Sequence, residues 1–342
     1  MKQSFEIGLT RDFLTPDGDY VYQDIGLAIL DRAPGVRYRF LAHNPPTMTP
    51  AELSGLDAVV SLGPRYTAAS VRGVDRLLAV IRFGVSTDMI DVPALTEADV
   101  GLFIAAGAVD HTMAESILAF MLAISHRLLQ KDRLLREGRW NERLRFMGWE
   151  LRDRTLGIVG LGGVGRKLVD MVKPFRMSRI VAHDPYVTEA PAGVDLVTLD
   201  RLMVDADFVS VCCPLTPKTR GLIGRREIGL MKPTAALINT ARGGIVDDGA
   251  LIEALKAGRI AGAGLDVFSE EPAQAGHLLA TLDNVVLAPH SVGWTHEFFR
   301  DIGTMNCSQA VSLSRGELPP GLVNREVLHR PGFLKKLEAR KP

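Results

Sequence analysis

Four residues whose side chains could transfer a proton or bind an anion follow predicted strands in the second half of the chain. Arg242 lies in NTARGGIVD, Asp266 and Glu271 lie in GLDVFSEEP, and His290 lies in APHSVGWT. An arginine can hold a carboxylate through two parallel hydrogen bonds, and an imidazole can give or take a proton near neutral pH. Because the carboxyl ends of parallel strands meet at one edge of a sheet, we expect these side chains to face one pocket.

These residues need a parallel sheet to position them, and the sequence predicts one. Near-continuous apolar runs, typical of strands covered on both faces, occur at 155–160, 179–184, 208–213, 235–240, 262–267 and 285–290. Helical patterns fit 164–173, 225–231 and 247–257. The alternation predicts a doubly wound α/β sheet for this part of the chain.

The first hundred residues show a second alternation of strands and helices. Short apolar runs occur at 5–9, 36–41, 57–62 and 77–83, with a loop at 44–50. Apolar residues at helical spacing predict one long helix from Asp110 to Gly138, capped by Asp110 or Thr112, and a further helix over 294–314. The segment 138–153 is expected to connect two domains.

The segment GLGGVG places Gly160, Gly162 and Gly165 in the dinucleotide-binding pattern G-x-G-x-x-G. It follows an apolar strand and begins a helix, and Asp184 ends the next strand about 20 residues further on. The first glycine permits a tight turn, the second lets the backbone approach a pyrophosphate, and the third lets helix and strand pack closely. Asp184 can bind the adenosine ribose and would repel a 2′-phosphate, so the sequence predicts NAD rather than NADP.

Taken singly, these features have plainer explanations. A glycine motif can be an ordinary turn followed by a surface aspartate, and an isolated histidine such as His290 is more often a core residue bonded to a backbone carbonyl. Cys212 and Cys213 end a buried strand and are expected to be core residues rather than nucleophiles. The functional interpretation therefore depends on several motifs occurring together in the expected order.

Composition excludes several classes of function. The 342 residues suggest two domains by length, and 40 Lys+Arg balance 40 Asp+Glu. A neutral chain has no global field that would attract nucleic acid or an anionic membrane. The cysteines and histidines show no metal-ligand spacing, the first twenty residues contain no apolar stretch of signal-peptide length, and no window reaches 18 consecutive apolar residues. We expect a cytoplasmic protein with no metal, nucleic-acid or membrane partner.

Together the motifs resemble the D-isomer-specific 2-hydroxyacid dehydrogenase family, which includes phosphoglycerate and glycerate dehydrogenase-like proteins. The similarity runs from RFGVSTDMIDV at 82–92 through AVDHTMAES, GLGGVG, PLTPKTRGLI and NTARGGIVDDGAL to GLDVF, EEP and PHSVG. It implies an α/β fold with two Rossmann-like doubly wound parallel-sheet domains. The NAD-binding domain, at 109–292, would be inserted into a discontinuous, flavodoxin-like substrate domain at 1–108 and 293–342. The resemblance also implies a homodimer, with the helix from Asp110 either at the interface or in the core.

The resemblance implies an Arg–Glu–His active site, carried over to Arg242, Glu271 and His290. Arg242 would bind the substrate carboxylate, His290 would act as general acid or base, and Glu271 would fix the imidazole tautomer. Glu271 is chosen because Glu270 precedes the matching position by one residue. The expected cofactor contacts are Gly160, Gly162, Gly163, Val164, Gly165, Asp184, Cys213, Pro214, Thr219, Thr240, Ala241, Arg242, Asp266, His290 and Gly293, with Thr112 either a contact or a helix cap.

A glycine-rich segment resembling R-x-G-V-G-x-D-N would bind the substrate carboxylate through backbone N–H groups. Here Ser86 replaces the second glycine and Met89 replaces the asparagine, so Val85 and Ser86 keep the donors while the pocket shape changes. Arg65 is either a surface residue or a ligand for a second anionic group, and Arg82 could add local positive charge. The substrate is thus defined only as a small anionic 2-hydroxy or 2-oxo acid.

The sequence therefore predicts an oxidoreductase that transfers a hydride between NAD(H) and C2 of such an acid, as a hydroxypyruvate reductase does. The alternative, from a different class, is an NADH-sensing corepressor or scaffold with the same fold. The intact Arg–Glu–His set argues against that alternative. A formate-dehydrogenase-like function is disfavoured because Glu271 stands where such enzymes usually have glutamine.

Overall fold

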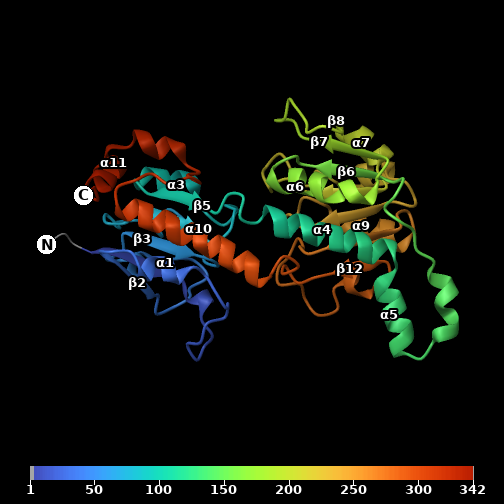
Figure 1. Cartoon of the computed structure of the whole chain (residues 1–342), viewed down its shortest axis with the longest axis horizontal. Helices are drawn as coiled ribbons and strands as arrows, with labels where there is room; N and C mark the ends of the chain where they lie inside the picture. Colours follow the sequence, from blue (N-terminus) through green and yellow to red (C-terminus); the bar gives the residue numbers. More distant parts are fainter. Residues whose placement is uncertain (1–3, 342) are drawn as a thin grey trace. The chain divides into compact units, whose positions relative to one another are not determined.

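The computed structural model describes residues 4–341 and divides into two compact units, each described here by itself (Figure 1). The first unit comprises Met1–Val109 and Trp294–Pro342, and the second comprises Asp110–Gly293. Both boundaries fall one residue later than the sequence predicts. Residues 1–3 and 342 of the predicted substrate domain lie outside the described residues. The second unit is an insertion, because the chain leaves the first unit once and returns to it.

The first unit contains a five-stranded parallel sheet in the order β2-β1-β3-β4-β5. Its strands are β1 (Phe5–Leu9), β2 (Val36–Phe40), β3 (Ala58–Ser61), β4 (Ala79–Arg82) and β5 (Gly101–Ile104). Its helices are α1 (Leu27–Asp31), α2 (Pro50–Leu53), α3 (Val92–Glu97), α10 (His296–Ser314) and α11 (Pro331–Glu338), with short 3₁₀ turns η1 (Arg11–Phe13) and η5 (Arg325–His329). The central strands β3 and β4 are almost wholly buried, as expected for parallel strands covered on both faces.

The C-terminal segment packs onto β5, which explains why the chain returns to this unit. The side chain of Asn324 is buried, accepts a hydrogen bond from the N–H of Leu102 and donates to the carbonyl of Val100. Gln309, on α10, donates to the carbonyl of Ile104. These bonds satisfy backbone groups on the edge strand that would otherwise be unpaired.

The second unit contains a seven-stranded parallel sheet in the order β12-β11-β10-β9-β6-β7-β8. Its strands are β6 (Thr155–Val159), β7 (Arg179–His183), β8 (Val194–Leu196), β9 (Phe208–Val211), β10 (Ala236–Asn239), β11 (Gly262–Leu265) and β12 (Val285–Leu287). Its helices are α4 (Asp110–Ser125), α5 (Leu128–Arg136), α6 (Gly163–Val172), α7 (Leu199–Asp205), α8 (Arg225–Leu230) and α9 (Asp248–Lys256), with 3₁₀ turns η2 (Trp140–Phe146), η3 (Lys173–Phe175) and η4 (Leu278–Thr281). The order in which the chain adds strands to the sheet reverses between β6 and β9, the position where open α/β sheets bind ligands.

The prediction of one long helix from Asp110 to Gly138 is wrong. The chain forms α4 and α5, which are bent by 59° relative to each other. Arg127 adopts a left-handed backbone conformation between them, with φ of 52°, and the N–H of Trp149 donates to the carbonyl of Ser125 at the end of α4. The apolar spacing continues through this bend, so periodicity alone could not reveal it.

The segment 138–153 does not connect the two units as predicted. It lies wholly within the second unit, where its residues Trp140–Phe146 form η2. In the part of the chain that the structure describes, no single helix is long and apolar enough to span a membrane. The bent pair α4 and α5 meets the length and composition criterion only when the two helices are taken together.

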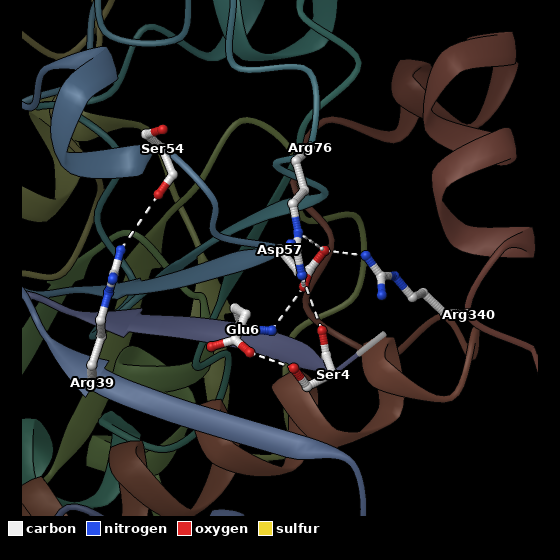
Figure 2. A network of polar contacts seen from close by, with 7 residues as sticks. All are labelled: Ser4, Glu6, Arg39, Ser54, Asp57, Arg76 and Arg340. Carbon is white, nitrogen blue, oxygen red and sulfur yellow. Dashed lines mark hydrogen bonds and ion pairs between the residues drawn. The ribbon is translucent and has the colours of Figure 1, made fainter. Parts of the chain in front are cut away.

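Figure 2 shows a buried carboxylate that joins three segments of the first unit. The side chain of Asp57 has no exposed surface and accepts hydrogen bonds from Arg76, at 3.0 and 2.6 Å, and from the N–H of Glu6, at 2.7 Å. Arg340, beyond α11, also pairs with it. Arg76 donates in addition to the carbonyl of Ser4. The carboxylate therefore ties the first strand and the C-terminal helix to the segment that precedes β3.

We expect Asp57→Asn to lower the free energy of unfolding of the first unit by about 3 kcal/mol, because removing one partner of a buried ion pair leaves the remaining charge uncompensated. Urea denaturation followed by circular dichroism measures this. Arg39→Gln is the matched control, since within the described residues the Arg39 side chain donates a single long bond of 3.4 Å, to the carbonyl of Ser54. An Asp57→Asn protein that unfolds at the wild-type urea midpoint would contradict the interpretation.

Candidate active site

The turn between β6 and α6 carries the glycine motif, and its glycines serve different purposes. Gly160 has φ of 99°, and a Cβ there would lie 2.6 Å from the backbone nitrogen of Cys213. A Cβ on Gly165 would lie 2.5 Å from the carbonyl oxygen of Gly160. Gly162, by contrast, has φ of −76°, and a Cβ there would meet no heavy atom within 4 Å. The fold therefore requires two of the glycines, whereas Gly162 leaves open space at the N-terminus of α6.

That open space fits a dinucleotide. A helix N-terminus offers unpaired N–H groups and a partial positive charge to a pyrophosphate, and only a residue without a side chain lets the pyrophosphate approach the backbone. Asp184 stands beside the turn directly after β7. Its Oδ2 accepts from the N–H of Leu161 at 2.9 Å, and its Oδ1 accepts from the N–H of Tyr186 at 2.9 Å. These bonds orient the carboxylate, which remains partly exposed and can accept from ribose hydroxyls.

The loop that follows β9 packs against the glycine turn. The backbone of Cys213 lies against Gly160, and burial raises the pKa of the Cys213 thiol to about 11. The thiol is therefore protonated at neutral pH, as expected for a packing residue. The hydroxyl of Thr219 donates to the carbonyl of Pro214 at 2.6 Å, which closes the loop on itself.

Gly162→Val should weaken NADH binding about ten- to a hundredfold, because the new side chain would occupy the space that a pyrophosphate needs. The apo fold should keep its stability, since the position is open and its φ is unstrained. Gly160→Val is the matched control and should destabilise the protein itself. Fluorescence titration with NADH and thermal unfolding separate the two effects. Normal NADH affinity in Gly162→Val would rule out this use of the open space.

The predicted catalytic residues follow three neighbouring strands of the same sheet. Arg242 follows β10, Glu271 follows β11 and His290 follows β12. Nδ1 of His290 lies 2.6 Å from Oε2 of Glu271, and Oε1 of Glu271 accepts from the N–H of Phe268 at 3.0 Å. Nε2 of His290 has no hydrogen-bond partner among residues 4–341, and 45% of the side chain is exposed. The imidazole is thus anchored at one nitrogen and accessible at the other.

Electrostatics around Glu271 keep it ionised. Burial raises its pKa, but hydrogen bonds from His290 and from the N–H of Phe268, with the charges of His290 and Arg242, outweigh burial and leave the pKa below its usual range. Such a shift stabilises the fold above the unfolded-state pKa of a glutamate, and the contribution is lost as the pH falls through the lower folded-state pKa. The group facing Nδ1 is therefore a carboxylate at neutral pH, which selects the tautomer with a proton on Nδ1.

Asp266 lies beneath the loop that carries His290. It is 2% exposed, and its Oδ1 accepts from the N–H groups of Ser291 and Val292 at 2.8 and 3.0 Å. Its backbone carbonyl accepts from the N–H of His290, whose φ is 51°. Burial raises the pKa of Asp266, against the opposing effect of these two hydrogen bonds. Asp266 therefore positions His290, a role that the sequence did not reveal, and its contact with the cofactor stays a prediction.

Arg242 is held at the end of β10 by its own backbone. Its Nη1 donates to the carbonyl of Ala241 at 2.6 Å, and its carbonyl accepts from the side chain of Asn239 at 3.0 Å. Thr240, which precedes this pair, is buried. These bonds fix the turn that presents the guanidinium on the same sheet edge as Glu271 and His290.

Contacts of α4 reach both the glycine turn and the His290 loop. The carboxylate of Asp110 adjoins Gly163, where a Cβ would lie 2.0 Å from Oδ2. The hydroxyl of Ser116 donates to the carbonyls of Thr112 and of Val292. Asp110 and Ser116 were not predicted as site residues, because only the folded chain brings α4 beside these loops.

Of the two roles predicted for Thr112, a helix cap and a cofactor contact, the structure excludes the helix cap. Since α4 begins at Asp110, both Asp110 and Thr112 lie inside its first turn, and neither occupies the N-cap position. A cofactor contact from Thr112 stays a prediction. Gly293 packs against Met113, so that a Cβ there would lie 2.7 Å from the sulfur. That glycine is explained by packing within the second unit.

The predicted substrate-binding residues of the first unit follow β3 and β4. The backbone N–H groups of Val85 and Ser86 donate to no residue among those described, and both residues are at least partly exposed. Arg65 is exposed and its guanidinium has no partner within residues 4–341. Nη1 of Arg82 donates to the carbonyls of Ser61, Leu62 and Phe83. Arg82 thus shapes the backbone around the loop, and the expected contribution of its positive charge stays a prediction.

Comparison with known proteins places this arrangement in a family. Residues 118–292 match the model of the D-isomer specific 2-hydroxyacid dehydrogenase NAD binding domain. The chain is 39% identical to the glyoxylate reductase of Korarchaeum cryptofilum over 286 residues, which covers 81% of this chain and 86% of the relative. The chain belongs to the D-isomer specific 2-hydroxyacid dehydrogenase family. The matched NAD-binding domain of this family member contains the glycine turn, Asp184, Arg242, Glu271 and His290.

One further relative and one solved structure are also similar to this chain. The family member is 42% identical over 270 residues to the D-3-phosphoglycerate dehydrogenase of Methanocaldococcus jannaschii, which covers 78% of this chain but 51% of the relative, so the chain spans about half the length of that protein. The structure of a glyoxylate reductase from Paecilomyes thermophila superposes with a TM-score of 0.78 at 25% identity, covering 92% of this chain and 97% of the other. The two parallel-sheet units therefore have the fold expected for the family.

Proposed function

We propose that this protein is an NAD-dependent D-2-hydroxyacid dehydrogenase that interconverts a small 2-hydroxy acid and the corresponding 2-oxo acid. The observation that carries the proposal is the His290–Glu271 pair, joined at 2.6 Å on the same edge of the NAD-binding sheet as Arg242. Family membership and the open space at Gly162 support the cofactor assignment. A proton-transfer pair and an anion-binding group are the two elements that this reaction requires besides the cofactor.

Each proposed catalytic residue has one task. Nε2 of His290 takes the proton of the substrate hydroxyl during oxidation and returns it to the carbonyl oxygen during reduction. Glu271 holds the ring through Nδ1 and stabilises the imidazolium that forms. Arg242 binds the substrate carboxylate bidentately, which fixes the orientation of C2. NAD, when bound through Asp184 and the glycine turn, supplies the acceptor or donor of the hydride.

The identity of the substrate is a more specific proposal than the class of reaction, and it is based on the relatives that this chain matches. The glyoxylate reductases match this chain over most of their length, whereas the phosphoglycerate dehydrogenase matches over about half of its length. We therefore propose a small unphosphorylated 2-oxo acid, such as glyoxylate or hydroxypyruvate, as the preferred substrate in the direction of reduction. The N–H groups of Val85 and Ser86 would add donors to its carboxylate, whereas Arg65 would bind the substrate only if the acid carried a second anionic group.

Steady-state oxidation of NADH tests this proposal with a panel of glyoxylate, hydroxypyruvate, pyruvate and phosphohydroxypyruvate. We expect the highest kcat/KM for glyoxylate or hydroxypyruvate, and a lower value with NADPH because Asp184 would repel its 2′-phosphate. Preference for phosphohydroxypyruvate would overturn the substrate but not the reaction class. Tight NADH binding without turnover of any 2-oxo acid would favour the corepressor or scaffold alternative.

We also propose that the protein forms a homodimer through α5 and η2. In Figure 1 these elements project from the body of the second unit, and they carry large apolar side chains that are exposed. The exposed residues are Leu128, Leu129, Leu135, Trp140 and Leu144, followed by Met147. Several large apolar side chains exposed along residues 128–147 favour a protein contact. One face of α4 packs in the core of its own unit, whereas Leu118 and Leu122 are partly exposed and Ala119 is exposed, so a contribution of α4 to the interface stays a prediction.

A further inference from the structure

A pocket lies at the edge of the seven-stranded sheet opposite to the candidate active site. Its volume is about 480 Å³, and its lining residues precede strands, with Arg154 before β6, Asp207 before β9 and Thr234 before β10. Arg127, from the bend between α4 and α5, and Trp149 complete the wall. The proposed catalytic residues all follow strands of this sheet, so the pocket is distinct from the site that they form.

The charges in this pocket are unbalanced. The guanidinium groups of Arg127 and Arg154 form no ion pair and donate no hydrogen bond within residues 4–341. The lining carboxylate, Asp207, is already engaged, because it accepts from the N–H of Thr155 at 2.8 Å and from Nζ of Lys232 at 3.1 Å. The two arginines therefore give the pocket a net positive charge that no side chain of the described chain neutralises.

Arg127 is the more constrained of the two arginines. It is half-buried and its guanidinium carbon lies 5.0 Å from the centroid of the Trp149 ring. Burial lowers the pKa of Arg127. By contrast, two exposed arginines of the adjoining helix α5 have acidic partners, since Arg136 pairs with Asp132 and Arg133 pairs with Asp283. A half-buried guanidinium with unsatisfied donors is unfavourable, and a bound anion would satisfy them.

We propose that this pocket binds a small metabolite through an oxyanion group, a phosphate or a carboxylate, held by Arg127 and Arg154. Guanidinium groups bind such anions through charge-assisted, often bidentate, hydrogen bonds. Thr234 is exposed at the rim and its hydroxyl offers a further donor. The volume exceeds that of the oxyanion alone and falls in the range of small-molecule sites, with Trp149 as an apolar wall for the organic part.

Inorganic phosphate and malonate serve as the two probes, because they distinguish a phosphate site from a carboxylate site. The NADH-loaded full chain is treated with phenylglyoxal at increasing probe concentration, and modification of each arginine is read by peptide mass spectrometry. We expect one of the probes to protect Arg127 and Arg154 saturably. Protection of Arg242 in the same spectra reports separately on the candidate active site, so failure of one site can be told from failure of the other.

Calorimetry measures probe binding to the wild type, to a double variant of the pocket and to a matched control variant. The double variant Arg127→Gln/Arg154→Gln should bind the preferred probe at this pocket about a hundredfold more weakly, while kcat/KM for NADH oxidation stays unchanged. Arg136→Gln, which alters an exposed arginine that is already paired, should bind as the wild type does. Thermal unfolding of each variant confirms that the fold is intact.

Three results would overturn the proposal. The first is that neither probe protects Arg127 and Arg154 saturably. The second is that the double variant binds the probe as tightly as the wild type does. The third is that Arg127 and Arg154 resist phenylglyoxal without any probe while the double variant has a lower mass in solution. That result would mean that a second copy of the chain, rather than a small anion, fills the pocket.

Discussion

Replacing His290 with glutamine should lower kcat for 2-oxo acid reduction by about 10²–10⁴-fold and leave the affinity for NADH close to that of the wild type. Glutamine can keep a hydrogen bond to Glu271 but cannot exchange a proton near neutral pH, so the loss reports the proton transfer itself. Single-turnover kinetics and NADH titration by fluorescence measure the two quantities. A His290→Gln enzyme with a near-normal kcat would exclude His290 as the general acid and base.

Two further variants make this test specific. Glu271→Gln keeps a hydrogen-bonding side chain beside Nδ1 but removes the charge that stabilises an imidazolium, so its kcat should fall less than that of His290→Gln. A shift of the pH–rate profile in this variant is the readout that a merely structural role would not produce. His111→Gln is the control, because His111 is exposed on α4 and its one ion pair among residues 4–341 is with Glu115, at 3.8 Å. It should behave as the wild type.

Much of the sheet architecture could be predicted because buried parallel strands leave a strong local pattern. Runs such as TLGIV, FVSV and ALIN are mostly apolar, and they form the largely buried strands β6, β9 and β10 as predicted. The edge strands β5 and β8 were not predicted. β8 has only three residues, two of them exposed, so it lacks the apolar run that marks a central strand. β5 follows a short helix closely and gains its second partner from the distant C-terminal segment, a contact that local sequence does not encode.

In the candidate site, too, some features could be predicted from the sequence and others could not. The order of Arg242, Glu271 and His290 along the chain, each after a strand, was sufficient to predict that they lie on one sheet edge. The supporting contacts were not predictable, because they join residues far apart in sequence. The buried carboxylate of Asp266 binds the backbone of a loop 25 residues later, and its residue type alone cannot show whether it faces a ligand or supports a neighbour.

Replacing Arg242 with glutamine should lower kcat/KM by about a hundred- to a few thousandfold, mainly through a higher KM. The physical reason is the loss of two charge-assisted hydrogen bonds to the substrate carboxylate. Arg242→Lys should recover only part of this loss, because lysine keeps the charge but lacks the planar fork that fixes C2. Steady-state kinetics with glyoxylate and hydroxypyruvate measure both variants.

Arg225→Gln is the control for the Arg242 variants, since Arg225 lies on α8 in the same unit and is exposed and paired with Glu253. It should leave kcat/KM unchanged. The Arg242 and His290 variants together distinguish binding from proton transfer. A loss in kcat alone for Arg242→Gln, with unchanged KM, would mean that Arg242 acts on the reacting carbonyl and that other donors bind the carboxylate. The backbone N–H groups of Val85 and Ser86, which have no acceptor among the described residues, would then be the first candidates for that role.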